Sequence, residues 1–389
     1  MAVYIAFTLL FVFLVIQYYI QTNRTRLCIN GPYMLCVLAT SPFIILMSLR
    51  GAVGTDIFNY ISIIKHILMG NYLWTYEPGF FLYIKLVSYF TKDPLLLCIA
   101  TGITTTTILL YSVKTSYQAQ FVLLACIIPI FYLEMTMNTI RSGLSFSLAM
   151  LATSLFYRNR VKISLVIGLI SLSIHLSSLI IFLLTLISVD IKNINKKISA
   201  IFIALVFIST IIAILLSLQN MQLNLANHRL ENIIQFITDK FHSYSNVKSP
   251  NIYSGLPILG ITLSVVYLIH KEESLCKESI TKLTFNLATI SVLSFLVAKF
   301  SYAGLRLQSA ILFGLLINLQ FNASFDQIVL KNKKSLMLIG AAGLLLFLKD
   351  IALQNGEGST PFIPWKVNPK LLVLKQSQVI IFRPQSLLI

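Results

Sequence analysis

Charged residues are scarce in this chain of 389 residues. Only 11% of the residues are charged, whereas 57% are hydrophobic, and the mean hydropathy is +0.84. Soluble domains carry about 25% charged residues, so the composition excludes a soluble fold. The apolar residues come in runs of roughly 15–20, the length with which a helix crosses about 30 Å of hydrocarbon.

Strand-like alternation, paired cysteines and the sequence signals of a cleavable leader are also absent. The missing alternation argues against a β-barrel, and the five cysteines form no CxxC pair, so we expect neither a disulfide framework nor a zinc site. The first apolar run has no basic segment before it and no small-residue cleavage site after it. We therefore expect a retained helix.

Motifs for several kinds of chemistry are missing too. The chain contains no GxxxxGK[ST] phosphate loop, no HExxH, no GxSxG and no DxD. The sequence therefore predicts neither NTP hydrolysis nor nucleotide-sugar chemistry. We expect no cofactor, no metal site and no nucleic-acid partner.

The apolar runs predict an all-α, polytopic integral membrane protein that forms a single domain over residues 1–389. About ten crossings are expected, at residues 3–20, 33–49, 95–113, 120–135, 143–157, 199–218, 253–269, 283–298, 304–321 and 336–348.

Basic residues outnumber acidic ones, and the formal net charge is +17. With the N-terminus outside, the short basic loops fall on the cytoplasmic side, as the positive-inside rule predicts. These loops carry Arg24 and Arg26; Arg158, Arg160 and Lys162; Lys192, Lys196 and Lys197; and Lys331, Lys333 and Lys334. About half of the lysines and arginines then lie outside, where that rule gives them no reason to be.

Two apolar segments do not fit simple crossings. Residues 80–90 are too short for a hairpin of two spans, and we interpret them as an interfacial or re-entrant helix, with a full crossing as the alternative. Residues 163–189 are too long for one straight span and too short for two. A bend at His175 followed by a return keeps the basic loop at Lys192 cytoplasmic, and we prefer it.

Residues 50–93 are expected to form an extracytoplasmic loop. Arg50 and a glycine-bearing stretch lead to Asp56, after which Tyr60 and several isoleucines recur at helical spacing. This pattern predicts an amphipathic helix on the membrane surface. Thr55 or Asp56 is either its N-cap or a functional group, and Arg50 is either a snorkelling anchor or a ligand of an anion.

Glu77 and Arg141 lie at predicted helix starts. Glu77 precedes Pro78, where a carboxylate matches the helix dipole, whereas Arg141 near the start of a span opposes it. An anion bound between Arg141 and the free N–H groups would remove that conflict. Neutralisation by Glu134 is the alternative.

His175 and Arg306 are the remaining candidates near predicted spans. An ionisable residue within an apolar stretch is a functional candidate, although His175 is alternatively a neutral imidazole bonded to a neighbouring helix. Arg306 either binds an anion or snorkels to the interface.

Two further outer segments are predicted. Residues 219–252 carry His228 and Arg229 beside apolar residues at helical spacing, and we interpret them as a lid over the outer face or as an inert interfacial helix. Residues 350–389 form an extracytoplasmic tail.

Four motifs in order carry a resemblance to a known family. They are Arg50-Gly-x-x-Gly54-Thr55-Asp56-x-x-Asn59-Tyr60, Glu77-x-Gly79, Asn138-x-x-Arg141-x-x-Leu144, and His175-x-Ser177-Ser178-Leu179-Ile180. Together they resemble the EpsG/Wzy-like polysaccharide polymerase family over nearly the whole chain. The family often has glutamine directly after the arginine of the third motif, where this chain has Ser142.

The resemblance implies a GT-C-like glycosyltransferase of the bacterial cytoplasmic membrane with its active site on the extracytoplasmic side. Its substrate would be an undecaprenyl-diphosphate-linked glycan in membrane lipid, with a flippase and a chain-length regulator as candidate partners. Arg50, Arg141 and Arg306 would bind the diphosphate, Asp56, His175 or Glu77 would handle the acceptor proton, and Tyr60, His228 and Arg229 would contact substrate. We expect inversion at the anomeric carbon and no requirement for metal.

Two other functions fit part of the pattern. A lipid-linked oligosaccharide flippase would place its charges between both leaflets, often in repeated halves, but no internal repeat is found. A ligase of the O-antigen type would share the donor and differ only in its acceptor.

Overall fold

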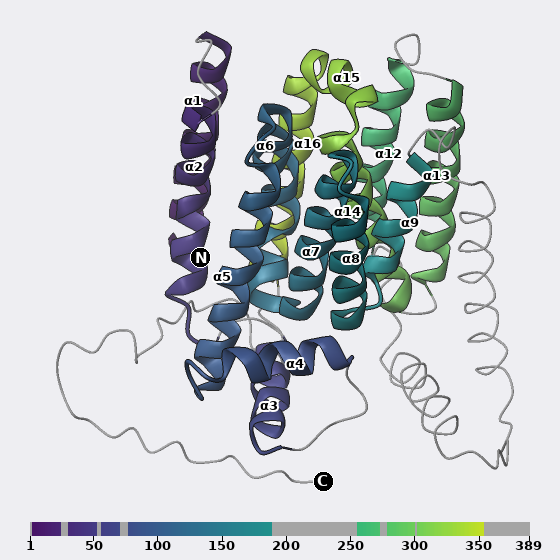
Figure 1. The fold of residues 1–389 in the computed structure, drawn as a ribbon. Coiled ribbons are helices and arrows are strands. Elements are labelled where there is room, and N and C mark those ends of the chain that lie inside the picture. Colours follow the sequence, from purple (N-terminus) through teal and green to yellow (C-terminus); the bar gives the residue numbers. More distant parts are fainter. Residues whose placement is uncertain are drawn as a thin grey trace, which may run out of the picture.

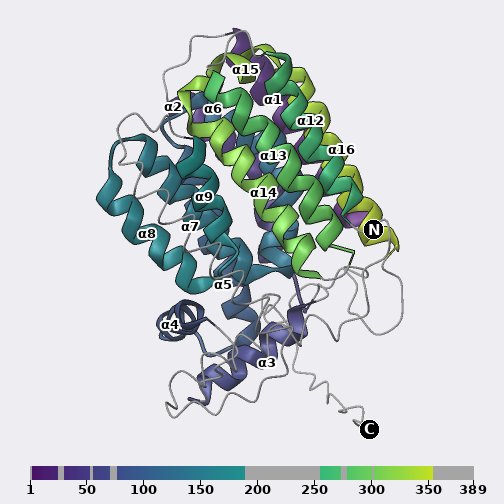
Figure 2. The same cartoon turned by 90° about the vertical axis from the view of Figure 1, so that its right-hand side faces the viewer.

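The computed structural model describes residues 2–24, 30–52, 56–70, 77–188, 255–272, 278–299 and 302–353. Every regular element in these ranges is a helix, which confirms the all-α prediction. The long helices stand side by side as a bundle, and α3 and α4 lie beneath one end of it (Figure 1; Figure 2).

The helices cover most of the described residues. The α-helices are α1 (Ala2–Arg24), α2 (Asn30–Ser48), α3 (Ile57–Leu68), α4 (Pro78–Val87), α5 (Pro94–Val113), α6 (Tyr117–Val122), α7 (Ile140–Tyr157), α8 (Val161–Ile174), α9 (Ser178–Ser188), α12 (Leu256–Lys271), α13 (Glu278–Val297), α14 (Tyr302–Phe321), α15 (Asp326–Lys331) and α16 (Lys333–Leu353). Two π-helical segments, η1 (Leu123–Tyr132) and η2 (Glu134–Asn138), lead from α6 to α7, and a 3-10 turn, η4 (Ala323–Phe325), precedes α15.

Four of the described helices are long and apolar enough to cross a membrane: Ala2–Thr22, Gly31–Ser48, Pro94–Val113 and Gly304–Phe321. Shorter apolar helices lie between them. A helix is present at each predicted crossing except residues 199–218, which lie outside the described residues. The chain is an all-α membrane protein, but the expected count of about ten spans is not supported, because only these four helices of the described residues meet both conditions.

Local sequence explains where several helices begin. Asp93 accepts hydrogen bonds from the backbone N–H groups of Leu95 (2.9 Å) and Leu96 (3.4 Å), and Pro94 occupies the first turn of α5. The N-terminus of α6 is capped in the same way by Ser116, whose hydroxyl accepts from Ala119 N–H at 3.2 Å.

The segment from α8 to α9 bends as the sequence predicted. α8 ends at Ile174, His175 is extended, and α9 begins at Ser178. Gly168 of α8 lies directly against the Phe182 ring of α9, so the two helices pack side by side and antiparallel. This confirms the preferred interpretation, a bend at His175 followed by a return.

α3 and α4 are seated on protein. α3 buries Ile57, Tyr60, Ile64 and Ile67, and these side chains form a small core with residues of α4, α5 and α7. The predicted amphipathic helix is therefore present, and its apolar face packs against neighbouring helices. Its place on the membrane surface stays a prediction. α4 lies roughly crosswise to the long helices (Figure 1), in line with an interfacial helix.

The two ends of the bundle differ in their residues. We call one the basic end, where the loops with Arg158, Arg160 and Lys162 and with Lys331, Lys333 and Lys334 lie. The end of α1 joins them there, because the Tyr117 hydroxyl donates to Thr22 Oγ1 at 2.9 Å and Lys333 Nζ donates to the Tyr117 hydroxyl at 3.3 Å. We call the opposite end, above α3 and α4, the site end.

Candidate active site

Residues far apart in the sequence meet at the site end. α2 finishes there, α7 and α14 begin there, and the break at His175 lies there (Figure 2). The predicted site residues Arg50, Asp56, Tyr60, Glu77, Arg141, His175 and Arg306 all come from these loops and helix ends.

Arg141 and Glu77 form a buried ion pair. Arg141 Nη1 lies 2.8 Å from Glu77 Oε2, and the two side chains are only 10% and 4% exposed. Removing one partner of such a pair is costly, because the other charge is then left buried without compensation. Glu77 is therefore a carboxylate that neutralises Arg141 directly.

A close contact between helices brings Glu77 to this place. A Cβ on Gly79 would lie 2.2 Å from Ser173 Oγ and 2.6 Å from the Ser173 backbone carbon. Only glycine lets the start of α4 approach the end of α8 so closely. The glycine of the Glu77-x-Gly79 motif thus fixes the position of the carboxylate beside it.

Asp56 occupies the N-cap position of α3, yet its side chain makes no capping hydrogen bond. Its backbone N–H donates instead to Asn138 Oδ1 at 2.9 Å, and Asn138 Nδ2 donates to Glu134 Oε1 at 2.9 Å. Burial raises the pKa of the Asp56 carboxyl, and the nearby charges of Arg306 and Arg141 oppose that rise. A partly buried carboxylate whose pKa is raised by burial is suited to accept a proton.

Tyr60 lies one helical turn after Asp56. Its side chain is buried, and its hydroxyl is hydrogen-bonded to the backbone of Arg141 near the N-terminus of α7. Burial raises the pKa of Tyr60 to about 12, and the positive charges of Arg141 and Arg306 act against it. Tyr60 therefore stays a neutral phenol that ties α3 to α7, and its predicted contact with substrate stays a prediction.

A cavity of about 210 Å³ opens beside these groups. Glu134, Arg306 and four hydroxyl groups line it; the hydroxyls belong to Thr139, Ser142, Ser177 and Ser309. The rest of the wall is apolar, from Phe131, Met135, Phe146 and Leu305, so the cavity combines an apolar surface with a few polar groups, as ligand sites usually do.

The sequence interpretation missed part of this cavity. Glu134 was considered only as a neutralising charge, and Ser142 only as a departure from a motif, yet both line the hollow. Glu134 is the first residue of the π-helical segment η2. Such segments are rare in proteins, and those that occur often lie at functional sites. The spacing of apolar residues does not predict a π-helical segment. The one sequence feature that could have identified Glu134 is that it is an acidic residue within an apolar run.

His175 is buried at the bend between α8 and α9. Its Nδ1 accepts a hydrogen bond from the Ser177 backbone N–H at 3.1 Å, and its carbonyl accepts from Ser145 Oγ at 3.2 Å. These bonds shape the bend and leave Nε2 as the nitrogen that carries the proton of a neutral ring. The predicted role in proton transfer stays a prediction.

Arg50 lies deeper than expected. It is fully buried, and its Nη1 donates to the backbone carbonyl of Met137. Burial lowers the pKa of the Arg50 guanidinium to about 10. Since Met137 precedes the Asn138 that holds Asp56, this structure gives Arg50 a supporting place beneath the site, and direct contact with a diphosphate stays a prediction.

Some predictions fall outside the described residues. His228 and Arg229, with the lid over residues 219–252, lie there, as does the tail after residue 353. Within the described ranges, no group of three or more His, Cys, Asp or Glu residues is placed to hold a metal ion.

Comparison with known families gives one match. The model of the EpsG family matches residues 33–367, which is most of the chain and includes all the residues of this site. No curated protein and no solved structure was found to match.

Proposed function

The chain belongs to the EpsG family, that of the Wzy/EpsG-like polysaccharide polymerases, and from this we propose that it joins undecaprenyl-diphosphate-linked oligosaccharide repeat units into a bacterial surface polysaccharide. The observation that carries the proposal is the convergence of Arg141, Arg306 and a desolvated Asp56 at one end of a membrane bundle. These groups match a reaction in which a diphosphate leaves and a hydroxyl loses a proton.

We propose that the chain lies in the bacterial cytoplasmic membrane with the site end outside. Lysines and arginines in short loops favour the cytoplasm, and they gather at the opposite end of the bundle. The diphosphate of a lipid-linked glycan lies at the membrane surface, where α3, α4 and the cavity are available to it.

Arginine is suited to the leaving group. Arg306 faces the cavity, and a guanidinium donates two parallel hydrogen bonds to phosphate oxygens with a permanent charge. Arg141 adds a second cation near the N-terminus of α7, where helix N–H groups also favour anions. Two such cations stabilise the charge that develops on the diphosphate without a metal ion.

Asp56 is our candidate for the base. The acceptor hydroxyl attacks the anomeric carbon of the donor, the new glycosidic C–O bond forms, and the bond to the diphosphate oxygen breaks. Its electron pair leaves with undecaprenyl diphosphate, and the acceptor proton passes to Asp56. Glu77 is engaged by Arg141 and His175 Nδ1 by Ser177, which favours Asp56 over both. A single displacement of this kind inverts the anomeric carbon.

The test is polymerisation of a defined lipid-linked repeat unit by the purified full-length protein, with and without a chelator. We expect a ladder of products in both conditions and single units only with Arg141→Ala. A ladder of normal length from Arg141→Ala would overturn the assigned role of this residue.

Two outcomes would favour other functions. Transfer of a finished glycan to a lipid or protein acceptor, without a ladder, would indicate a ligase. Movement of intact lipid-linked units across the bilayer of proteoliposomes, without new glycosidic bonds, would indicate a flippase.

A further inference from the structure

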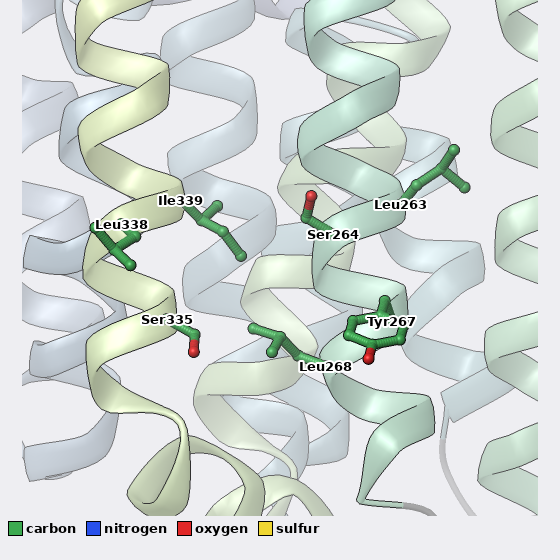
Figure 3. A pocket seen from close by; sticks show the side chains of 7 residues that line it. All are labelled: Leu263, Ser264, Tyr267, Leu268, Ser335, Leu338 and Ile339. Atoms are coloured by element: carbon green, nitrogen blue, oxygen red, sulfur yellow. The ribbon is translucent and has the colours of Figure 1, made fainter.

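A second hollow lies between α12 and α16, away from the site end. Its volume is about 410 Å³, within the range of roughly 300–1,000 Å³ that is usual for ligand pockets. Leu263, Leu268, Leu338 and Ile339 form most of its wall, and Ser264 is a small residue in it (Figure 3). The groove is therefore apolar along most of its length.

The groove opens on the outer surface of the bundle. Leu338 is 71% exposed and Tyr267 is 63% exposed. In a membrane protein, apolar side chains on the outside of transmembrane bundles face lipid chains. We therefore expect a lipid acyl chain to lie against this groove.

One end of the groove is polar. Figure 3 shows the Tyr267 and Ser335 hydroxyls directed toward the same end, where α12 finishes and α16 begins. That end is the basic end, and the exposed side chains of Lys271 and Lys334 lie there. Nearby, Lys331 Nζ lies 3.5 Å from Glu272 Oε2, so one carboxylate is already matched by a lysine.

We propose that this groove binds an anionic phospholipid from the leaflet at the basic end. One acyl chain lies between α12 and α16, and the headgroup phosphate meets Lys271 and Lys334. Basic pockets between membrane helices bind anionic headgroups in this way. The site is separate from the reaction and does not depend on the proposed function.

The test uses the full-length protein in detergent, incubated with an equimolar mixture of phosphatidylglycerol and phosphatidylcholine. Native mass spectrometry then identifies the lipid that stays bound. We expect phosphatidylglycerol to be retained in preference. Because each lysine near the surface adds about 1 kcal/mol, Lys271→Ala and Lys334→Ala should each weaken its binding by about fivefold.

Groove-filling variants test the apolar part. Ser264→Phe should reduce the retention of both lipids, whereas Thr107→Phe on the exposed face of α5 should not. Lys162→Ala is the matched control for charge, since Lys162 is exposed at the same end but lies on α8. Thermal unfolding of each variant without lipid shows that it is folded.

Three results would overturn the proposal. Equal retention of the two lipids would exclude recognition of the headgroup, and unchanged retention by Ser264→Phe would exclude the groove. A dimer that Ser264→Phe dissociates, with lipid binding unaffected, would show that a second copy of the chain covers this face.

Discussion

The buried arginines at one end of the bundle and the exposed lysine pair at the other hold their charges in opposite ways. At the basic end, Lys331 is 56% exposed and lies 3.5 Å from Glu272. At the site end, Arg141 is 10% exposed and lies 2.8 Å from Glu77, and Arg50 is fully buried. The charges of Lys331 and Glu272 stay in contact with water. The charges of Arg50 and Arg141 are removed from water, and hydrogen bonds or a counter-charge must offset that cost.

This difference separates the cations that set the orientation of the protein in the membrane from those that serve the proposed reaction. Exposed lysines in short loops need no partner to set the topology of a membrane protein. Buried arginines are costly unless each finds a hydrogen bond or a counter-charge, so their presence at one end indicates a function there. The following variants test that contrast, in order of decreasing effect.

Breaking the buried pair should have the largest effect. Arg141→Met leaves Glu77 buried without its partner, and we expect a loss of about 3–5 kcal/mol in stability together with loss of polymer. The double variant Arg141→Met/Glu77→Gln should regain most of the stability and still make no polymer. Unfolding of the purified protein and the polymerisation assay measure the two effects. Wild-type stability in the single variant would contradict the buried pair.

Asp56→Asn should lower the rate by about 10²–10⁴, the contribution of a positioned base. The fold should remain, since the Asp56 side chain makes no capping hydrogen bond that the change could remove. Asp93→Asn is the matched control, because Asp93 caps α5 and lies outside the site. A rate for Asp56→Asn close to that of wild type would exclude Asp56 as the base.

The raised pKa of Asp56 also predicts opposite pH trends for rate and stability. The rate should rise as pH increases through the pKa of this carboxyl, which burial places above its usual value. The folded state holds the proton more tightly than the unfolded state, so this group's stabilising contribution is present at low pH and is lost as pH rises through the folded pKa. Both trends should be absent from Asp56→Asn.

A methyl group at the α4–α8 contact should have a smaller effect. Gly79→Ala places Cβ against Ser173, and we expect a loss of about 1–3 kcal/mol in stability with reduced polymer, because Glu77 moves with α4. The control is Gly260→Ala in α12, where no atom lies within 4 Å of the new Cβ. Since alanine favours a helix, that change should stabilise by up to about 1 kcal/mol. Equal effects in both variants would contradict the close contact.

Lys331→Ala should have the smallest effect. Exposed ion pairs contribute about 0–1 kcal/mol, so stability and polymer formation should stay close to those of wild type. A loss comparable with that of Arg141→Met would remove the distinction between the two ends.

Several features of the fold could be predicted from the sequence. Long apolar runs gave helices such as α1 and α5, and the hydroxyls of Thr104, Thr106 and Thr107 bond carbonyls of their own helix, as short polar side chains in apolar helices do. The bend at His175 followed from the length of the apolar segment together with the position of the basic loop at Lys192. The number of spans could not be predicted, because helices at some predicted crossings, such as α12 with 16 residues, are apolar but shorter than a full span.

The pairing of the site residues could not be predicted in this way. For Arg141 the sequence suggested a bound anion, with Glu134 as the alternative, and it did not suggest Glu77; packing of α4 on α8 brings Glu77 to Arg141. Likewise, no local pattern indicated that Asn138 holds the Asp56 backbone, or that Arg50 lies fully beneath the site.

By itself, the sequence determined that this is a helical membrane protein with basic loops at one end and a set of motifs at the other. Apolar runs and loop charges act locally, through transfer of each segment between water and lipid. Only the tertiary structure decided that Glu77 meets Arg141 and that the Asp56 carboxyl is desolvated. It also decided which side chains face the cavity. Those choices depend on contacts between helices that are distant in sequence, and packing sets these contacts.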